Sequence, residues 1–301
     1  MSDFVQQQNV ICNFSNSDSW VVLSPIEQSI KKKIEAVGTP LKDWDIQINY
    51  GIKTGFNEAF IISTEKREEI LANCQTEDER KRTAELIRPI LRGRDIKRYG
   101  YVNNGLYLIN THNGIRGKLP RIDINDYPAV KAHLDQYWDK IATRADKGDT
   151  PYNLRNCAYM EEFSKPKVVY MEIQTDNPEE GYPFPCFSYD KKNCVVLNTA
   201  YIMSSETTDP KYVLGILNSK LGKFLVKLYV TQLQERQFRM LSQYVMKFPI
   251  ARPSKKQENE MVRLVWNVLA HQSKISENMI DELAFKIYKL SEIETKFLIS
   301  K

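Results

Sequence analysis

Hydrophobic positions in the first two thirds of the chain alternate over short runs, which predicts strands. In WDIQINY the apolar and aromatic side chains fall on one face and the polar ones on the other. The apolar face consists of Trp44, Ile46, Ile48 and Tyr50, and this alternation is typical of a half-buried strand. The turn-forming segment GIKTGFN follows, and EAFIIS is a second apolar run. Residues 44–63 are therefore expected to form a hairpin.

The middle of the chain mixes helical and strand patterns. Charged segments at 64–74 and 77–88 indicate helices, and the second helix should stop before Pro89. Further on we expect a strand near 105–109, an amphipathic helix over 127–144, an apolar strand over 166–173 and a second β-rich region in FPCFSYD and CVVLNTAYIMSS. This mixed order of strands and helices predicts an α+β body.

Helical spacing dominates the last third of the chain. The segment 209–229 carries a wide stripe of leucine and valine, and Pro249 and Pro253 end the body that contains it. Residues 254–301 show helical periods, and Ser291 and Glu294 within them have capping-box spacing. Near the N-terminus a short helix is expected over 26–36. We thus expect three segments: a polar lead-in with a short helix over 1–39, the main body over 40–252, and a helical segment over 253–301.

Basic residues are concentrated in one part of the sequence, residues 80–121. Two carboxylates, Glu85 and Asp95, accompany eleven cations there: Arg80, Lys81, Arg82, Arg88, Arg92, Arg94, Lys97, Arg98, Arg116, Lys118 and Arg121. This window carries +9 and the whole chain +5, so the remainder is net acidic. Concentrated like charge repels itself, and a polyanion such as nucleic acid relieves that repulsion. A solvated helix face is the alternative interpretation, chiefly for residues 80–88.

The second half of the basic window holds residue types that bind nucleic-acid backbones. Arginine forks suit phosphate oxygens, and a tyrosine can stack on a base or hydrogen-bond a phosphate. The turn GIKTG adds a lysine and a threonine, whose side chains can donate hydrogen bonds to phosphate oxygens. The predicted phosphate contacts are Lys53, Thr54, Arg92, Arg94, Lys97, Arg98 and Tyr99.

The segment 229–241 carries side chains that read base edges. Glutamine and arginine form bidentate hydrogen bonds with adenine and guanine, respectively. The candidate base-reading residues are Gln234, Arg236, Gln237 and Arg239. The plain alternative is an exposed polar connection.

The sequence does not match the residue spacing of the catalytic motifs that we considered. GIKTG lacks the upstream glycine of a P-loop, and a strand is expected after it instead of a helix. An adenine methyltransferase needs a nucleotide-binding glycine turn and a [DNS]-P-P-[YFW] tetrapeptide, but Asn177-Pro178 continues with two glutamates. Five scattered cysteines and three isolated histidines indicate free thiols and no zinc site. No apolar run is long enough to cross a bilayer. We expect a cytoplasmic chain that is not catalytic by itself.

Six blocks of the sequence occur in the order and spacing of a known family. They are LKDWDIQINYGIKTGFNEAFII, IRPILRGRDIKRYGY, FSKPKVVYMEI, VVLNTAYIM, YVLGILNSKLGKFL and KFPIARP. In these blocks the chain resembles the TaqI-like C-terminal specificity domain. That module is the target recognition domain of Type IIG restriction-modification enzymes and of adenine-specific DNA methyltransferases. The resemblance covers roughly residues 20–300, and the tail IDELAFKIYKLSEIETKFL shares it.

The resemblance implies a mixed α/β target-recognition fold with β-sheets and flanking helices, followed by helices that pack against a partner domain. Residues 40–252 would read a short double-stranded DNA sequence and present it to a methyltransferase domain, in cis or in trans. The methyltransferase domain would use S-adenosylmethionine, and this chain lacks that domain. Base-reading residues of the family vary with the target, so none transfers by motif.

Two other functions stay open at this point. The apolar face of residues 254–301 suits a protein-interaction subunit of a phage-defence assembly, in which the contact with DNA would be incidental. RNA binding is the other, although the sequence carries no stacking signature of a known RNA module.

Overall fold

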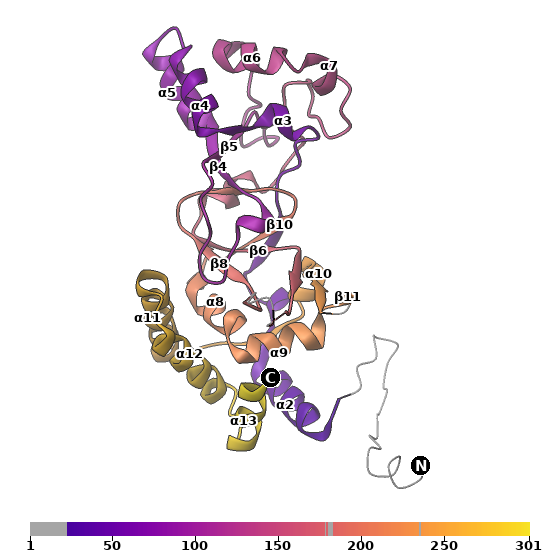
Figure 1. Cartoon of the computed structure of the whole chain (residues 1–301), viewed down its shortest axis with the longest axis vertical. Coiled ribbons are helices and arrows are strands. Elements are labelled where there is room, and N and C mark those ends of the chain that lie inside the picture. Colours follow the sequence, from indigo (N-terminus) through magenta and orange to yellow (C-terminus); the bar gives the residue numbers. More distant parts are fainter. Residues whose placement is uncertain (1–22, 178, 180–182, 235) are drawn as a thin grey trace. The chain divides into compact units, whose positions relative to one another are not determined.

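The computed structural model describes residues 23–301 except 178, 180–182 and 235, so most of the predicted lead-in lies outside the described residues. Two compact units form. The sheet unit is Ile46–Pro210, and the helical unit consists of the segment that ends at Asp45 together with Lys211–Lys301. Most strands belong to the sheet unit, and the long C-terminal helices belong to the helical unit (Figure 1). The predicted α+β class is confirmed.

One sheet of the sheet unit has the strand order β2-β10-β6-β8 and is antiparallel throughout. Its strands are β2 (Gln47–Tyr50), β10 (Ala200–Ser204), β6 (Lys167–Met171) and β8 (Phe187–Asp190). The two central strands come from the apolar runs PKVVYMEI and TAYIMSS, and β10 is buried along its whole length. Strands covered on both faces need continuous apolar sequence, which these two segments supply.

A second sheet has the strand order β3-β5-β4-β9. It contains β3 (Ile61–Ser63), β5 (Leu106–Ile109), β4 (Ile87–Leu91) and β9 (Val195–Val196), and β4 pairs with β9 in parallel. The core of the unit forms around this sheet. Ile90, Leu108 and Val195 are at least 96% buried in it, together with side chains from the neighbouring helices.

Short helices lie beside the second of these sheets. They are α3 (Asn57–Phe60), α4 (Thr64–Ala72), α5 (Glu77–Leu86), α6 (Pro128–Asp135) and α7 (Trp138–Ile141), with 3-10 turns at Gly93–Asp95, Ile124–Asp126 and Met160–Ser164 and a further strand β7 (Ile173–Thr175). Local sequence sets the starts of α4 and α5. The side chains of Ser63 and Thr76 accept hydrogen bonds from the third residue of each helix and so satisfy amides that the helix leaves unpaired.

The predicted hairpin over residues 44–63 is wrong. Within that range β2 pairs with β10 and β3 pairs with β5, so the two strands belong to different sheets. Residues 58–60, expected to begin the second strand, lie in α3. Alternation marks a strand but not its partner, and here both partners come from distant parts of the sequence.

Two long predicted helices are interrupted. The helix expected over 127–144 pauses at Gln136, whose amide donates to the carbonyl of His133 in a tighter turn (3.3 Å). The helix expected over 209–229 divides into α8 (Pro210–Asn218) and α9 (Lys220–Tyr229). Ser219 separates them because its hydroxyl caps α9 by accepting from the amide of Gly222 (3.1 Å).

The helical unit confirms the helices that the sequence predicted at both ends of the chain. They are α2 (Pro25–Val37) and, near the C-terminus, α11 (Lys255–His271), α12 (Lys274–Ile287) and α13 (Glu292–Ser300); the unit also contains a 3-10 turn (Leu41–Asp43) and α10 (Ser242–Val245). The capping box predicted for Ser291 and Glu294 is present at the start of α13.

A two-stranded sheet brings the two ends of the helical unit together. Strand β1 (Gly38–Pro40) pairs antiparallel with β13 (Pro249–Ala251). The hydroxyl of Tyr288, on a fully buried side chain, donates to the carbonyl of Pro249 (2.9 Å) and accepts from the amide of Ala251 (2.8 Å). The boundaries of the two compact units therefore differ from those of the predicted segments 1–39, 40–252 and 253–301. The division into these three segments concerns function and stays a prediction.

Candidate nucleic-acid interface

A rigid turn follows strand β4 and carries the centre of the basic window. Arg92 forms a fork with Asp95, donating through Nε to Oδ2 and through a terminal nitrogen to Oδ1, both at 2.9 Å. The side chain of Asn104 also donates to Asp95 (2.7 Å). Burial by itself raises the pKa of Asp95, but the hydrogen bonds from Arg92 outweigh it, so the pKa is lowered and the carboxylate stays charged.

Backbone bonds fasten the end of this turn to strand β8. The amide of Tyr99 donates to Phe187 (2.7 Å), and the carbonyl of Tyr99 accepts from Tyr189 (3.1 Å). Tyr99 has a φ of 68°, which is unfavourable for a bulky side chain and persists because these two bonds hold it. Residues between the fork and Tyr99 are thus presented on a fixed scaffold.

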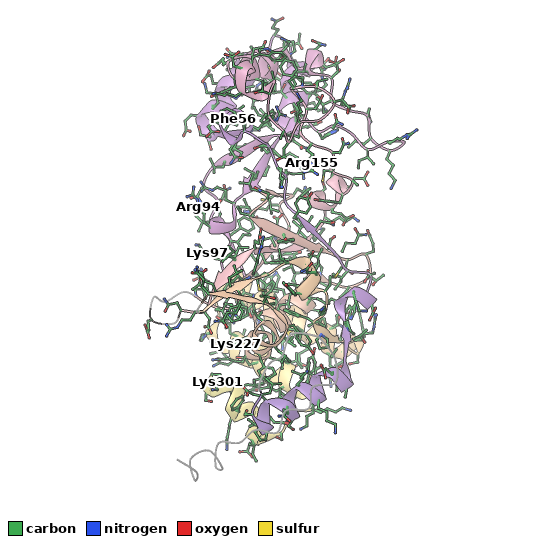
Figure 2. The ribbon with its side chains drawn as sticks, turned by 90° about the vertical axis from the view of Figure 1, so that its right-hand side faces the viewer. Phe56, Arg94, Lys97, Arg155, Lys227 and Lys301 are labelled. Carbon is green, nitrogen blue, oxygen red and sulfur yellow. The ribbon has the colours of Figure 1, made fainter. Side chains whose placement is uncertain are left out.

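Arg94 and Lys97 are the exposed cations on that scaffold. The ammonium of Lys97 donates to the carbonyl of Arg94 (3.0 Å), so the two residues lie together. Figure 2 shows the two labelled residues near one another. Neither side chain forms an ion pair with a described residue, so both charges face solvent.

The other predicted phosphate contacts are less accessible. Thr54 is 2% exposed and donates to the side chain of Asn57 (2.6 Å), and Tyr99 is 5% exposed. Lys53 and Arg98 are half-buried, and the guanidinium of Arg98 lies over the ring of Tyr99. The pairing of Arg92 with Asp95 gives it a structural role without any phosphate. The predicted contacts of all these residues stay predictions, and Arg94 with Lys97 has the geometry that suits one best.

Strand pairing divides the basic window into two groups. Strand β4 runs antiparallel to β5, with Ile87 opposite Ile109 and Pro89 opposite Tyr107. Residues 92–98 leave the end of β4 that lies beside the start of β5, whereas residues 113–121 leave the far end of β5. Arg94 and Arg116 therefore lie beyond opposite ends of this pair. The basic window thus contains a first basic region at residues 92–98 and a second one at residues 113–121.

A buried ion pair beneath the first basic region was not predicted. The ammonium of Lys167 lies 2.6 Å from Oδ2 of Asp190, and both side chains are completely buried. Tyr101 ties the end of the basic turn to this pair by donating its hydroxyl to Oδ1 of Asp190 (3.0 Å). Burial lowers the pKa of Lys167, while its partner opposes that shift. The feature of the sequence that could have indicated this ion pair is the lysine at the start of the apolar run KVVYM.

Arg88 also has an internal role. A terminal nitrogen of its guanidinium donates to the carbonyl of Asn193 (2.9 Å) and to the hydroxyl of Ser164 (3.3 Å). Burial lowers its pKa, as expected for a cation held away from water. Position within a basic window therefore does not make a residue part of a binding surface.

The candidate base-reading residues come together on one hairpin of the helical unit. Strand β11 (Gln232–Gln234) pairs antiparallel with β12 (Gln237–Arg239), with Gln234 opposite Gln237. Phe238 is buried and anchors one face of β12. Gln237 and Arg239 point to the opposite face because strand side chains alternate. Gln234 is exposed and lies opposite Gln237, next to a register shift between Gln232 and Gln234. Arg236 is exposed at the turn, where its φ is 66°.

Other kinds of site find little support in the described part of the chain. Those residues contain no cluster of histidine, cysteine and carboxylates that suits a metal ion. None of the described helices has the length and apolar character needed to span a bilayer. The described cysteines Cys74, Cys157, Cys186 and Cys194 are free thiols.

Comparison with known proteins identifies the class. The model of the TaqI-like C-terminal specificity domain matches residues 88–250, which is more than half of the chain and includes the rigid turn and the β11–β12 hairpin. The chain therefore belongs to the family of TaqI-like C-terminal specificity domains. The sequence-based resemblance is confirmed.

Individual proteins are also similar to this chain. The Type II methyltransferase M.BstVI of Geobacillus stearothermophilus is 21% identical over 294 residues, which cover 95% of this chain and 47% of that protein. The chain thus spans about half the length of that curated relative. The Type IIL restriction-modification enzyme MmeI, solved in complex with DNA, matches with a TM-score of 0.60 and 14% identity over 87% of this chain and 36% of its own. The Type IIG restriction endonuclease BpuSI matches with a TM-score of 0.48 and 10% identity over 88% of this chain and 34% of its own.

Proposed function

We propose that this chain recognises a short sequence in double-stranded DNA and presents it to a methyltransferase domain. The observation that carries the proposal is the β11–β12 hairpin, which holds Gln237 and Arg239 on the face turned away from buried Phe238 and places exposed Gln234 opposite Gln237. Glutamine and arginine are the side chains that pair with adenine and guanine edges in the major groove of B-DNA.

Arg94 and Lys97 would supply phosphate contacts for the same complex. Phosphate contacts fix the position of a protein on the duplex, and base contacts specify the sequence. The fork of Arg92 with Asp95 and the bonds of Tyr99 to β8 hold the two cations in place before DNA arrives. Less side-chain and loop entropy is then lost on binding.

The catalytic partner belongs to the proposal as well. A methyltransferase domain, in the same polypeptide or on a partner, would bind S-adenosylmethionine and carry out the methyl transfer. This chain's own sequence lacks the glycine turn and the [DNS]-P-P-[YFW] tetrapeptide of such a domain, so its residues would serve recognition only. Free thiols suit the cytoplasm, where we place the complex.

Salt titration of duplex binding tests the proposal. The whole chain should bind duplexes at low salt with an affinity that falls steeply as salt rises, because counterions are released from the DNA. The double variant Arg94→Ala/Lys97→Ala should bind all duplexes more weakly and lower the slope of log K against log salt by about 2. The matched control Lys256→Ala/Lys286→Ala removes two exposed cations from α11 and α12 and should leave the slope unchanged.

The outcome also separates this function from a protein-interaction role. A chain that shows no salt-dependent binding to any duplex at low ionic strength, yet captures a methyltransferase subunit, would be an interaction subunit with incidental DNA contact. That result would overturn the proposal.

A further inference from the structure

A groove in the sheet unit lies at the second basic region. It has a volume of about 880 Å³ and is bordered by the loop 113–121, which we call the groove loop, and by residues 149 and 156–158. Arg116, Lys118 and Arg121 are the cations of its lining, and Asp149 is the anion. The groove therefore carries a net positive charge.

The groove loop is built as a closed, tight structure. The amide of Ile122 donates to the carbonyl of His112 (3.2 Å) and closes its base. Within the loop Ile115 and Leu119 form an antiparallel bridge, and the amide of Lys118 donates to the carbonyl of Ile115 (2.9 Å). Residues 115–118 thus form a β-turn of the type that needs a left-handed third residue, and Gly117 supplies it with a φ of 76°.

Side-chain bonds fix the loop to the opposite wall of the groove. Asn113 donates through Nδ2 to Oδ1 of Asp149 (3.0 Å) and accepts through Oδ1 from the amide of Asp149 (2.8 Å). The same Nδ2 donates to the side chain of Asn156. Gly114 has a φ of 75°, and a Cβ there would meet the carbonyl oxygen of Leu119 at 2.6 Å. The loop therefore has a fixed shape before any ligand binds.

The charges of the groove favour an anionic ligand. Arg116 and Lys118 flank the glycine at the tip of the turn, and both are exposed. Asp149 already accepts from Asn113 and lies 3.4 Å from Arg121, so it offsets one cation and leaves the two at the tip uncompensated. Arginine and lysine side chains only donate hydrogen bonds, and their cationic groups form strong charge-assisted hydrogen bonds with phosphate oxygens.

The groove is separate from the rigid turn that holds Arg94 and Lys97. The two basic regions leave opposite ends of the β4–β5 pair, and the five residues of β4 alone correspond to roughly 16 Å. A DNA duplex has phosphates along its whole length, with about 34 Å per turn, so one duplex is long enough for both regions.

We propose that the groove loop is a second phosphate-binding element for duplex DNA, in which Arg116 and Lys118 hold backbone phosphates and Arg121 supports them from the wall of the groove. This inference rests on the proposed recognition of DNA and adds a contact that the sequence did not assign. A contact at the tip of the loop adds affinity and sets the position of the duplex, and it carries no base preference.

The test uses the whole chain in the salt titration described above. The variant Arg116→Ala/Lys118→Ala should reduce the slope of log K against log salt by about 2 and leave the order of preference among duplex sequences unchanged. Lys256→Ala/Lys286→Ala again serves as the charge-matched control. Thermal unfolding of each variant verifies the fold, and both substituted side chains are exposed.

Each outcome decides the inference. Duplex binding by the wild-type chain together with a slope equal to that of the control variant would exclude the groove loop while leaving the proposed function intact. A changed order of sequence preference would mean that the loop reads bases, which also overturns a phosphate-binding role. Absence of salt-dependent duplex binding by the wild-type chain would reject the proposed function and this inference together.

Discussion

Asp190 receives hydrogen bonds from residues that are far apart in the sequence. The ammonium of Lys167 and the amide of Cys194 donate to Oδ2 at 2.6 and 2.9 Å. The hydroxyl of Tyr101 and the amide of Lys192 donate to Oδ1 at 3.0 and 2.8 Å. Each lone pair of a buried carboxylate thus meets a donor, which is the condition under which a buried ion pair is tolerated. The network holds the end of the rigid turn against strand β8.

Removing the cation of this pair should destabilise the chain strongly. The substitution Lys167→Met leaves the charge of Asp190 buried without its ammonium, and we expect a loss of about 3–5 kcal/mol in the free energy of unfolding. Lys165→Met is the matched control, because Lys165 is partly exposed and pairs with Glu162 and Glu206. An exposed pair is worth at most about 1 kcal/mol. Urea unfolding followed by circular dichroism measures both, and equal losses would contradict a central role for the buried pair.

Glu294 should make the stability of the chain depend on acid pH. Burial raises the pKa of this carboxyl, but hydrogen bonds from Lys33, Ser29 and Ser291 prevail and lower it to about 2. A pKa lowered by folding stabilises the folded state above the unfolded value near 4.5, and this stabilisation is lost as the pH falls towards 2. Its size is on the order of 2–3 kcal/mol.

The substitution Glu294→Gln should remove that dependence. At pH 7 the variant should be less stable than the wild-type chain, and the difference should shrink as the pH is lowered from 5 towards 2. Urea unfolding over this pH range measures the difference. Glu292→Gln, on the same helix with an 80% exposed carboxylate, should show little difference at any pH. A gap between the Glu294 variant and wild type that stays constant with pH would contradict the assignment.

At the scale of elements, substitutions on the β11–β12 hairpin and substitutions on the rigid turn should have different effects on DNA binding. The hairpin presents amide and guanidinium groups beside exposed strand positions, whereas the turn presents the two cations Arg94 and Lys97. Substitutions on a hairpin that reads bases should alter the sequence preference. Substitutions on the turn should weaken the affinity for all sequences equally.

We expect the substitution Gln237→Ala to relax the preference at one base pair. Selection from a pool of randomised duplexes defines the preferred sequence, and competition binding then measures the loss. The preferred duplex should bind about 1–3 kcal/mol less tightly, with an unchanged salt slope. Gln28→Ala on α2 makes the same chemical change at an exposed position outside the hairpin and should leave the preference intact. An unchanged preference in the Gln237 variant would remove that residue from the base-reading set.

On the scale of the whole molecule, the chain leaves the helical unit at Asp45 and returns to it at Lys211. The sheet unit has its own core and both of its four-stranded sheets are internal to residues 46–210. The helical unit needs both of its chain segments, because β1 from one pairs with β13 from the other.

Segments of the chain should therefore behave differently when they are expressed alone. Residues 46–210 should unfold cooperatively, since they keep their core and sheets. Residues 211–301 should not unfold cooperatively until a peptide of residues 24–45 supplies α2 and β1. Calorimetry and circular dichroism measure both. Non-cooperative unfolding of 46–210, or cooperative unfolding of 211–301 without the peptide, would contradict the two-unit division.

Local signals in the sequence account for much of the fold. The capping pair Ser291–Glu294, the stripe of α9 and the apolar runs of β6 and β10 each depend on residues close together in the chain, so periodicity and capping rules predict them. The same rules failed for residues 44–63. The pairing of β2 with β10 and of β3 with β5 joins distant segments and leaves no local trace.

For the candidate site, the sequence by itself determined the residue types: a basic window, a Gln- and Arg-rich segment, and the family blocks. Only the tertiary structure decided which of these side chains face solvent. It paired Arg92 with Asp95, buried Thr54 and Tyr99, and placed Arg94 and Arg116 at opposite ends of one strand pair. Charge and chemical type belong to each residue and survive in any fold. Exposure, partners and separation arise from contacts between residues far apart in the chain, and only the folded chain brings them together.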